Sequence, residues 1–278
     1  MTKVSNSCQS RTSKIAGIIT LGWSNSPSGR AKLRLGISGL ARRILRLRSR
    51  PYPVQTPKSV LVVAPHPDDE TLGCGGVLAR IIRAGGTVNV LFVTDGRASH
   101  PGHPLISPGT LAALRHDEAR AATGALGIEW RNVFFLDSPD GALASLDLAH
   151  TNELVAKIAN ILTKTSAEVL LLTYRHDGST DHEASVALVK KALSATRQRP
   201  QILEFPIWAW RNPLMLVRPI LTSRVIWSVD ISNVKGMKIA ALDAYISQTR
   251  PIPPDLMPVL SPEFTSEFTF DEEFLFER

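Results

Sequence analysis

Apolar residues follow two different spacings from Ser59 onward, and the two spacings alternate along the chain. Continuous runs of Val, Leu and Ile predict buried strands at Ser59–Ala64, Thr87–Thr94, Asn132–Leu136, Glu168–Thr173 and Gln201–Phe205. The stretches between these runs have helical spacing, which predicts helices at Thr71–Ala84, Thr110–Leu126, Leu148–Thr163 and His182–Arg197. Continuous apolar strands separated by helices are typical of a parallel sheet covered on both faces. We therefore predict an α/β fold with a mostly parallel sheet.

The chain before Ser59 has a different pattern. Residues 1–29 show no sustained period, whereas five apolar residues between Arg30 and Arg50 fall at helical spacing, and prolines at positions 51, 53 and 57 mark a boundary. We predict a flexible, basic N-terminal tail over residues 1–56 and one domain over residues 57–278. Three alternatives remain for the helical stretch: a mobile leader, a helix docked on the domain, and a basic amphipathic helix on an anionic membrane surface. Its apolar positions are Leu33, Ile37, Leu40, Ile44 and Leu47.

Charge is distributed unevenly between the tail and the domain. The 278 residues include 32 Lys or Arg and 25 Asp or Glu, a net charge of +7. Residues 1–56 contain eleven of the basic residues and no acidic ones, so residues 57–278 have 21 basic and 25 acidic residues, a net charge of −4. Nucleic-acid enzymes usually carry their positive patch on the folded domain, so we expect no nucleic-acid partner. The basic tail favours a peripheral contact with a membrane.

Cys8 and Cys74 lie in very different contexts and give no disulfide pattern, which suits a reducing compartment. We expect a cytoplasmic protein, with membrane association through the tail as an open alternative. The sequence gives no indication of the oligomeric state.

The first predicted strand runs directly into Pro65-His66-Pro67-Asp68-Asp69-Glu70. Parallel sheets bind ligands beyond the carboxyl ends of their strands. An imidazole and three carboxylates beside apolar sequence are costly to hold together unless a cation neutralises them. His66 and Asp69 are three residues apart across a turn, so both can face one ion, while Asp68 stays free to act as a base. The alternative, that the acids only cap the helix, leaves His66 unexplained.

A second polar cluster, YRHDGSTDHE at residues 174–183, follows the fourth strand and also opens a helix. His182 can complete a His, Asp, His set that leaves a position for water. Three nitrogen and oxygen ligands plus water fit catalytic zinc. Asp181 is expected to be an outer partner of this site or a helix N-cap. Either histidine alone is more often structural, but two such loops on one rim of one sheet favour a shared metal.

The segment VVAPHPDDETLGCGG, residues 62–76, resembles the AHPDDE signature of the LmbE/PIG-L-type deacetylases. The resemblance extends over roughly residues 58–278 and implies a Rossmann-like α/β fold, bound Zn²⁺, and hydrolysis of N-acetylglucosaminyl groups on lipids, thiols, peptides or other sugars. Weaker matching blocks are Val93–Gly96, Arg115-x-x-Glu118 with Leu126-Gly127, Phe134–Gly141, Asp181-His182, and Lys238 through Ser247-Gln248.

The resemblance also implies roles for individual residues. It gives His66, Asp69 and His182 as zinc ligands and Asp68 as the general base. Arg115 and Asp140 match sugar-contacting positions; the alternatives are an exposed helix charge for Arg115 and a turn residue for Asp140, since Pro139-Asp140-Gly141 is a good turn sequence. Trp208 and Trp210 look like residues near the mouth of the site, where they either stack on a sugar ring or simply pack.

One position departs from the family pattern. Members commonly have His three residues before the last ligand, where it helps to stabilise the oxyanion, and this chain has Ser179 there. Losing an oxyanion donor typically lowers the rate by about 10²–10³. We expect Ser179 or His176 to substitute and to complete the catalytic set with Asp68.

Together these features predict a metal-dependent hydrolase that removes the acetyl group from an N-acetylglucosamine-type sugar or glycoconjugate. One alternative is a metal-dependent hydrolase of another bond, and another is a degenerate sugar-binding relative with little turnover. The Gly73-x-Gly75-Gly76 run lies inside a predicted helix, so we interpret it as close helix–sheet packing rather than as a nucleotide-binding loop.

Overall fold

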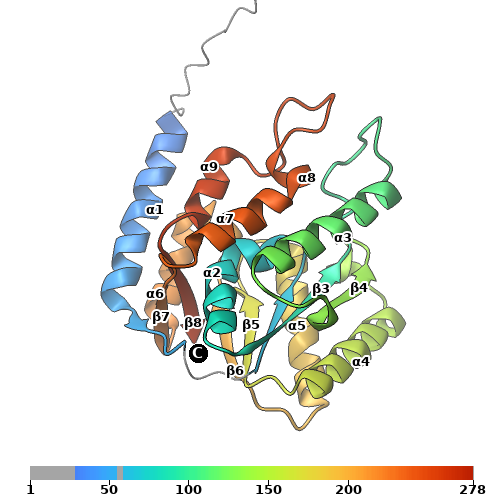
Figure 1. Cartoon of the computed structure of the whole chain (residues 1–278), viewed down its shortest axis with the longest axis horizontal. Coiled ribbons are helices and arrows are strands. Elements are labelled where there is room, and N and C mark those ends of the chain that lie inside the picture. The colour runs from blue at the N-terminus through green and yellow to red at the C-terminus, as the bar shows by residue number, and fades with distance from the viewer. Residues whose placement is uncertain (1–28, 55–58, 278) are drawn as a thin grey trace, which may run out of the picture.

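A computed structural model describes residues 29–54 and 59–277, which are built around one eight-stranded sheet (Figure 1). The order of strands across the sheet is β1-β7-β8-β6-β5-β2-β3-β4. The strands are β1 (Arg50–Pro51), β2 (Ser59–Ala64), β3 (Thr87–Thr94), β4 (Val133–Ser138), β5 (Val169–Thr173), β6 (Gln201–Phe205), β7 (Val225–Asp230) and β8 (Glu272–Glu277).

Helices cover the sheet and form its connections. The α-helices are α1 (Gly29–Arg48), α2 (Asp69–Arg83), α3 (Pro108–Ala125), α4 (Leu148–Thr165), α5 (Thr180–Ser194), α6 (Val217–Thr222), α7 (Lys235–Ala244), α8 (Ile246–Thr249) and α9 (Pro262–Thr265). Five 3₁₀ turns are η1 (Trp130–Asn132), η2 (Leu143–Ser145), η3 (Trp208–Trp210), η4 (Pro213–Leu216) and η5 (Ser266–Phe268). Within the described ranges, none of these helices combines the length and hydropathy needed to cross a bilayer.

The predicted α/β fold with a mostly parallel sheet is confirmed. All five predicted strands and all four predicted helices of the domain are present, with ends shifted by a few residues. Strands β7 and β8 were not predicted, and β8 runs antiparallel to both β6 and β7. Their sequences, VIWSVD and EEFLFE, mix polar residues into short apolar runs, so neither has the continuous apolar pattern of a central strand.

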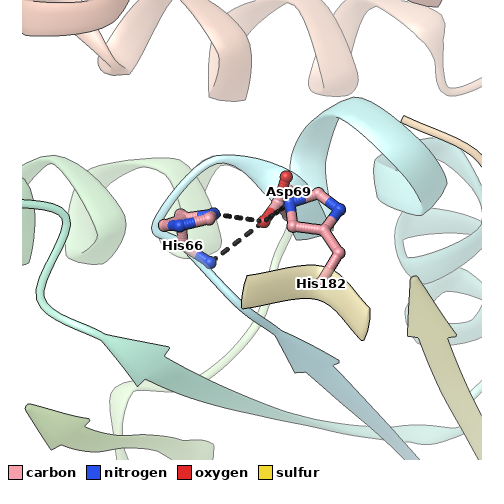
Figure 2. Close-up of side chains that lie close together, drawn as sticks. All are labelled: His66, Asp69 and His182. Atoms are coloured by element: carbon pink, nitrogen blue, oxygen red, sulfur yellow. Dashed lines mark hydrogen bonds and ion pairs between the residues drawn. The ribbon is translucent and has the colours of Figure 1, made fainter. Parts of the chain in front are cut away.

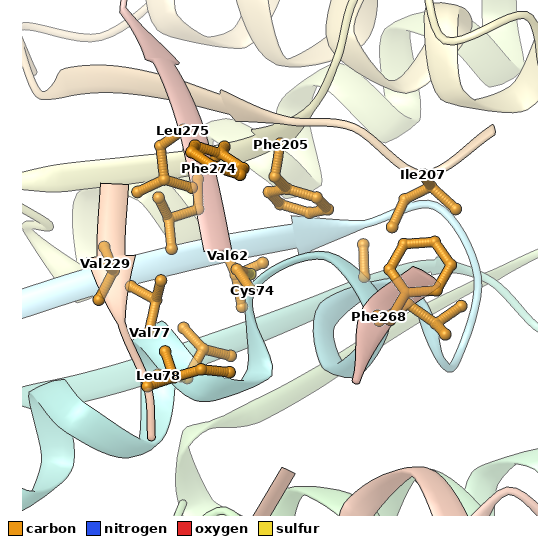
Figure 3. Packing of buried hydrophobic residues seen from close by; sticks show 14 of the residues in the cluster. Val62, Cys74, Val77, Leu78, Phe205, Ile207, Val229, Phe268, Phe274 and Leu275 are labelled. Carbon is orange, nitrogen blue, oxygen red and sulfur yellow. The ribbon is translucent and has the colours of Figure 1, made fainter. Parts of the chain in front are cut away.

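Two apolar clusters occupy the two faces of the sheet. Along β2, Val60 and Val62 belong to the larger cluster, and Leu61 and Val63 to the smaller one, as the two-residue period of a strand requires. The larger cluster is completed by residues of α1, α2, α3 and α7, and part of it is shown in Figure 3. The smaller cluster is completed by α4 and α5. The sheet is therefore covered on both faces.

The connections leave a crevice at the centre of the sheet. β2 pairs with β3 on one side and with β5 on the other. The chain proceeds from β3 outward to β4, but from β5 in the opposite direction to β6. The loops that follow β2 and β5 therefore diverge at a topological switch point, which is where open α/β sheets bind their ligands.

Part of the predicted N-terminal tail packs against the domain. β1 pairs in parallel with β7, and the side chain of Leu45 in α1 is fully buried. The Arg42 guanidinium lies 4.2 Å from the ring centroid of Trp210 and 3.8 Å from that of Phe270. These contacts agree with the docked-helix alternative for residues 29–48. Residues 1–28 and 55–58 lie outside the described part of the chain, and the division at residue 57 stays a prediction.

The glycine run allows α2 to approach its neighbours closely. A Cβ atom at Gly76 would lie 2.6 Å from the side chain of Ile231, and one at Gly73 would overlap the ring of Phe205. The helix is broken at Cys74, which has φ −146° and ψ 16°. The predicted packing role is thus confirmed for Gly73 and Gly76.

We predict that Gly76→Ala destabilises the protein by about 1–3 kcal/mol, because the added methyl group must displace the side chain of Ile231 from a packed core. Chemical denaturation of the full chain measures the change. Gly124→Ala in α3 is the matched control: its Cβ meets nothing within 4 Å, and alanine favours the helix by about 1 kcal/mol. Equal effects of the two substitutions would contradict the packing argument.

Candidate metal centre

His66 and Asp69 face each other across the turn that joins β2 to α2 (Figure 2). The backbone N–H of His66 donates to Oδ2 of Asp69 over 2.9 Å, and Nδ1 of His66 lies 3.2 Å from the same oxygen. Asp69 is the first residue of α2, where the unpaired N–H groups of a helix favour a carboxylate. The turn therefore positions an imidazole and a carboxylate oxygen toward one point.

His182 reaches the same point from the first turn of α5, the helix that follows β5. Its Nε2 lies 3.2 Å from Oδ2 of Asp69, and the His66 and His182 rings have centroids 5.4 Å apart. The side chain is fully buried, and Nε2 makes no hydrogen bond of acceptable geometry to any described residue. A buried nitrogen that has no hydrogen bond and is directed at a carboxylate fits a metal ligand.

Asp177 holds the other nitrogen of His182. Its Oδ2 lies 2.8 Å from Nδ1 of His182. The same carboxylate accepts hydrogen bonds from the backbone N–H groups of Ile207, Trp208 and Ala209, at 3.0, 2.9 and 3.0 Å. A carboxylate on the second ring nitrogen fixes the tautomer and orientation of a metal-ligating histidine.

Asp181 is an outer partner of the site, as one alternative predicted, but through His66 rather than through His182: its Oδ2 lies 3.4 Å from Nε2 of His66. Asp181 precedes His182 directly on α5, so the two side chains leave the helix in different directions. Its carboxylate also accepts the backbone N–H groups of Gly141 and Leu143, at 2.7 and 3.2 Å. The N-cap alternative was wrong, because Ser179 precedes the first helical residue.

The carboxylates create a strongly negative environment around the two imidazoles. Burial lowers the pKa of His182, but Asp69 and Asp177 outweigh it and raise the pKa to about 9. Burial likewise opposes the charged form of His66, yet Asp140, Asp181 and Asp69 raise its pKa well above the ordinary value. Both shifts mean that positive charge is stabilised at this point. A divalent cation held by His66, Asp69 and His182 would supply that charge and leave both imidazoles neutral.

These three residues satisfy the geometry expected of a ligand set. One donor atom from each lies within 4.8 Å of the others, and His66, Asp140 and Asp181 form a second such group that shares His66. In the second group, Asp140 and Asp181 also accept backbone N–H groups, whereas Nε2 of His182 has no such partner. The first group is therefore the better candidate for a metal.

Asp68 lies beside these residues in an unusual conformation. Its φ of 134° is rare for any residue other than glycine, and such strain persists only where neighbours enforce it. The buried carboxylate of Glu70 accepts the backbone N–H of Asp68 over 3.1 Å and the hydroxyl of Tyr245 over 2.7 Å. Glu70 thus holds the turn in place, and the Asp68 carboxylate is free to face the cavity.

Arg115 pairs with Asp68 from helix α3. Its Nη2 lies 3.1 Å from Oδ2 of Asp68 and also donates to the carbonyl oxygen of Pro67. The side chain is only 2% exposed, so the alternative of an exposed helix charge was wrong. Gly96 has φ +66°, and a Cβ there would come within 3.1 Å of Nε of Arg115. Glycine at this turn therefore leaves room for the guanidinium.

The environment of Asp68 changes its acidity. Burial raises the pKa of Asp68 to about 7, against the opposing effect of the Arg115 charge. In Asp69, by contrast, burial is outweighed by His182 and His66, which lower the pKa well below the ordinary value. Two adjacent carboxylates thus differ in proton affinity, one suited to hold a cation and the other to exchange a proton near neutral pH.

A cavity of about 290 Å³ opens over these residues. Asp140 lines this cavity, and its Oδ1 lies 3.1 Å from Nε2 of His66. Asp140 is therefore both a turn residue and a residue of the site. Trp208 lines the wall and stacks on Phe264 at 5.1 Å, whereas Trp210 is buried beneath Arg42. Only Trp208 of this pair can therefore contact a bound molecule.

The two candidate substitutes for the oxyanion histidine occupy different positions. Ser179 lines the cavity, and its side chain makes no capping hydrogen bond to α5. His176 is not among the residues that line the cavity, and its ring lies edge-on to Tyr174 at 5.7 Å. The geometry favours Ser179.

Sequence reasoning missed some residues that build the site. Gln248 lines the cavity, and its Nε2 donates to the hydroxyls of Ser99 and Ser247, at 3.2 and 2.8 Å. The carboxylate of Glu118 fixes the backbone N–H and hydroxyl of Ser247, at 2.6 and 2.7 Å. Glu118, Ser247 and Gln248 had been noted only as parts of matching blocks, because nothing in their local pattern indicates that α3 and α8 meet.

Comparison with known proteins identifies relatives of this chain. Residues 61–193 match the family model PIG-L, described as GlcNAc-PI de-N-acetylase. A diacetylchitobiose deacetylase of Thermococcus kodakarensis is 27% identical over 201 residues, 70% of this chain and 72% of the relative. A 1D-myo-inositol 2-acetamido-2-deoxy-alpha-D-glucopyranoside deacetylase of Kineococcus radiotolerans is 30% identical over 164 residues, 50% of this chain and 45% of the relative.

A solved structure shows that the fold is not confined to deacetylases. The 4-carboxy-2-hydroxymuconate hydratase of Pseudomonas putida KT2440 superimposes with a TM-score of 0.58 over 76% of this chain and 83% of the hydratase. At 19% identity this likeness concerns the fold alone. The residues of the site, rather than the fold, must therefore decide the reaction.

We predict that Asp177→Asn lowers the affinity for Zn²⁺ by about 10–100-fold, because Nδ1 of His182 loses its carboxylate partner. Competition with a chromogenic chelator measures the affinity without reference to activity. Asp147→Asn is the matched control, since Asp147 caps α4 at an exposed position, and its zinc affinity should equal that of the wild type. Unchanged affinity in Asp177→Asn would contradict the assigned role.

Proposed function

We propose that this chain is a zinc-dependent N-deacetylase, a proposal supported by the match of residues 61–193 to the PIG-L family model. It removes the acetyl group from an N-acetylglucosamine-type sugar or glycoconjugate. The observation that carries the proposal is the convergence of His66, Asp69 and His182 beside a strained Asp68 whose carboxylate is not part of that set. Relatives named as deacetylases of N-acetylated sugars support the same reaction.

A zinc ion held by His66, Asp69 and His182 would supply a Lewis acid and bring the pKa of a bound water to about 7. The donor set of two nitrogens and one oxygen suits this metal. Asp177 keeps the His182 ring in the orientation that leaves Nε2 free for the metal.

Asp68 acts as the general base. Its carboxylate accepts a proton from the water that attacks the acetyl carbonyl carbon, and Arg115 holds it in position. The C–N bond of the amide then breaks, and the carboxyl group of Asp68 can return the proton to the departing amine. The products are acetate and the free amino sugar. A pKa near neutrality allows Asp68 both to accept the proton from water and to return it to the amine, because proton transfer is most effective when the pKa is close to the working pH.

Ser179 stabilises the negative charge that develops on the carbonyl oxygen. Its hydroxyl is at the cavity wall, where the family commonly has a histidine. Asp140 and Arg115 contact the sugar, and Trp208 offers an aromatic surface for one face of the ring. This arrangement gives the chain a complete set of groups for amide hydrolysis.

The test of the proposed function is the release of free amine and acetate from a panel of N-acetylglucosamine derivatives by the zinc-loaded full chain. Asp68→Asn should lower the rate by about 10²–10⁴ while zinc affinity is retained, because the asparagine cannot accept the proton. Hydrolysis of phosphoesters in place of amides would favour a different metal-dependent hydrolase. Sugar binding without turnover by the wild type would favour a degenerate sugar-binding relative.

The pH profile should follow the same carboxylate. Asp68 is an effective base only when ionised, so kcat/KM should rise with pH through the pKa of this group and then level off. Burial raises that pKa to about 7, and a nearby cation favours the ionised form, so the midpoint should lie at or below about 7. Zinc content measured at each pH separates this effect from loss of the metal. A rate that falls as pH rises from 5 to 7 would rule out this assignment.

Ser179→Ala should lower kcat by about 10²–10³ with little change in KM, because the lost hydroxyl acts mainly on the transition state. His176→Ala is the control and should leave kcat close to that of the wild type. The reverse result would show that His176 is the oxyanion donor. Ser179→His, which installs the residue common in the family, should retain activity.

A further inference from the structure

Two segments far apart in the sequence, α1 and the consecutive elements η4 and α6, lie in contact and both expose apolar side chains. Helix α1 lies beside η4 and α6 in the structure (Figure 1). Leu40 and Leu47 on α1 are 59% and 78% exposed, and Leu214, Val217 and Leu221 on η4 and α6 are 67%, 49% and 67% exposed. We call these five residues with Arg43 and Arg218 the Leu/Arg face.

The charge of the Leu/Arg face has a single sign. Residues 29–54 and 205–229 contain no Asp or Glu, although arginine is frequent in both. Arg43 and Arg218 are exposed, and neither has an acidic partner in the described part of the chain. Arg46, at the border of the face, pairs with Glu272 over 2.8 Å. The face therefore combines exposed leucines with uncompensated positive charge.

Helix α1 presents this face while it remains docked. The sequence grouped Leu33, Ile37, Leu40, Ile44 and Leu47 into one apolar stripe. The side chain of Leu33 lies outside the described part, and the structure divides the other four. Ile37 and Ile44 are half-buried next to the fully buried Leu45, whereas Leu40 and Leu47 point outward. Arg43 lies between Leu40 and Leu47 on the exposed side of α1. The helix therefore packs on the domain with one side and exposes apolar and basic residues on the other, without leaving the domain.

We propose that the Leu/Arg face binds the surface of an anionic lipid bilayer. Interfacial protein surfaces combine apolar side chains, which enter the boundary between headgroups and acyl chains, with basic side chains that contact anionic headgroups. Arginine suits this position because its apolar stem lies along the boundary while its charge remains at the headgroups.

Other occupants fit the same surface less well. A second copy of the chain would place two faces of the same positive charge against each other, which opposes association. A nucleic acid would satisfy the arginines, but its phosphate backbone offers no apolar surface for the exposed leucines. An anionic bilayer satisfies both kinds of side chain.

Helix α1 contacts the 3₁₀ turn η3, which contributes to the wall of the cavity. On the inner side of α1, Arg42 lies over the ring of Trp210, and Trp208 in the same 3₁₀ turn lines the cavity. The proposal does not depend on the reaction, because no residue of the face belongs to the metal site.

Cosedimentation of the full chain with lipid vesicles tests the proposal. The protein should sediment with equimolar phosphatidylcholine and phosphatidylglycerol, remain in solution with phosphatidylcholine alone, and be released by high salt. The double variant Leu47→Glu/Leu221→Glu should bind about tenfold less or weaker still, because it removes apolar contacts and adds like charge at the surface. Arg43→Glu/Arg218→Glu should have a similar effect.

Leu148→Glu/Arg197→Glu is the matched control, with an exposed leucine and an exposed arginine outside the face. It should bind vesicles as the wild type does. Thermal unfolding and hydrolysis of a water-soluble N-acetylated sugar show that each variant is folded and active.

Three outcomes would overturn the proposal. The wild type could fail to bind the anionic vesicles, or the double variants could bind them as well as the wild type, which would locate the contact elsewhere on the chain. Alternatively, the wild type could bind polyuridylate, or dimerise in sedimentation velocity, without binding vesicles. Loss of that association in the double variants would then assign the face to a nucleic acid or to a second copy of the chain. Failure of the proposed deacetylation alone would leave vesicle binding unaffected, so the two proposals can be distinguished.

Discussion

The site depends on the convergence of buried carboxylates on two imidazoles at the centre of the sheet. Asp69 lies between His66 and His182, and Asp177 holds the far side of the His182 ring. Such a concentration of negative charge away from water is costly unless positive charge accompanies it. The strand order places this cluster at the switch point between β2 and β5, where the connecting chain diverges and leaves space for a ligand. The strand order thus places the charged cluster at the position where the fold leaves space for a ligand.

Much of the core architecture could be predicted from the sequence because it depends on local patterns. The central strands β2, β3 and β5 are continuous apolar runs, and their two-residue period assigns side chains to the two faces. The β1-β7-β8 end of the sheet was not predictable in the same way. Strand β8 is antiparallel and contains three glutamates, and its place between β6 and β7 is fixed by pairing with strands distant in sequence. The docking of α1 depends on Arg42 meeting Trp210 and Phe270, and no local pattern specifies that contact.

The candidate site shows the same division. The spacing of His66, Asp68 and Asp69 indicated which side chains could face one ion, since a turn and a helix start restrict their directions. Helix geometry also indicates that Asp181 is not the carboxylate that holds His182, because adjacent helical residues point in different directions. By contrast, Ser179 and His176 could be separated only by knowing which of them lines the cavity. The burial of Arg115 likewise follows from the packing of α3 over the turn, which no periodicity reveals.

The Asp177 carboxylate joins the histidine to the neighbouring segment through main-chain amides alone. Every amino acid except proline supplies such an amide, so these bonds place no demand on the side chain of Trp208 in the cavity wall, whereas core packing restricts Ile207 and Ala209. This point of the cavity wall is therefore open to variation during evolution while the hydrolytic centre is conserved. A scaffold of this kind can acquire new sugar specificities by single substitutions in that wall.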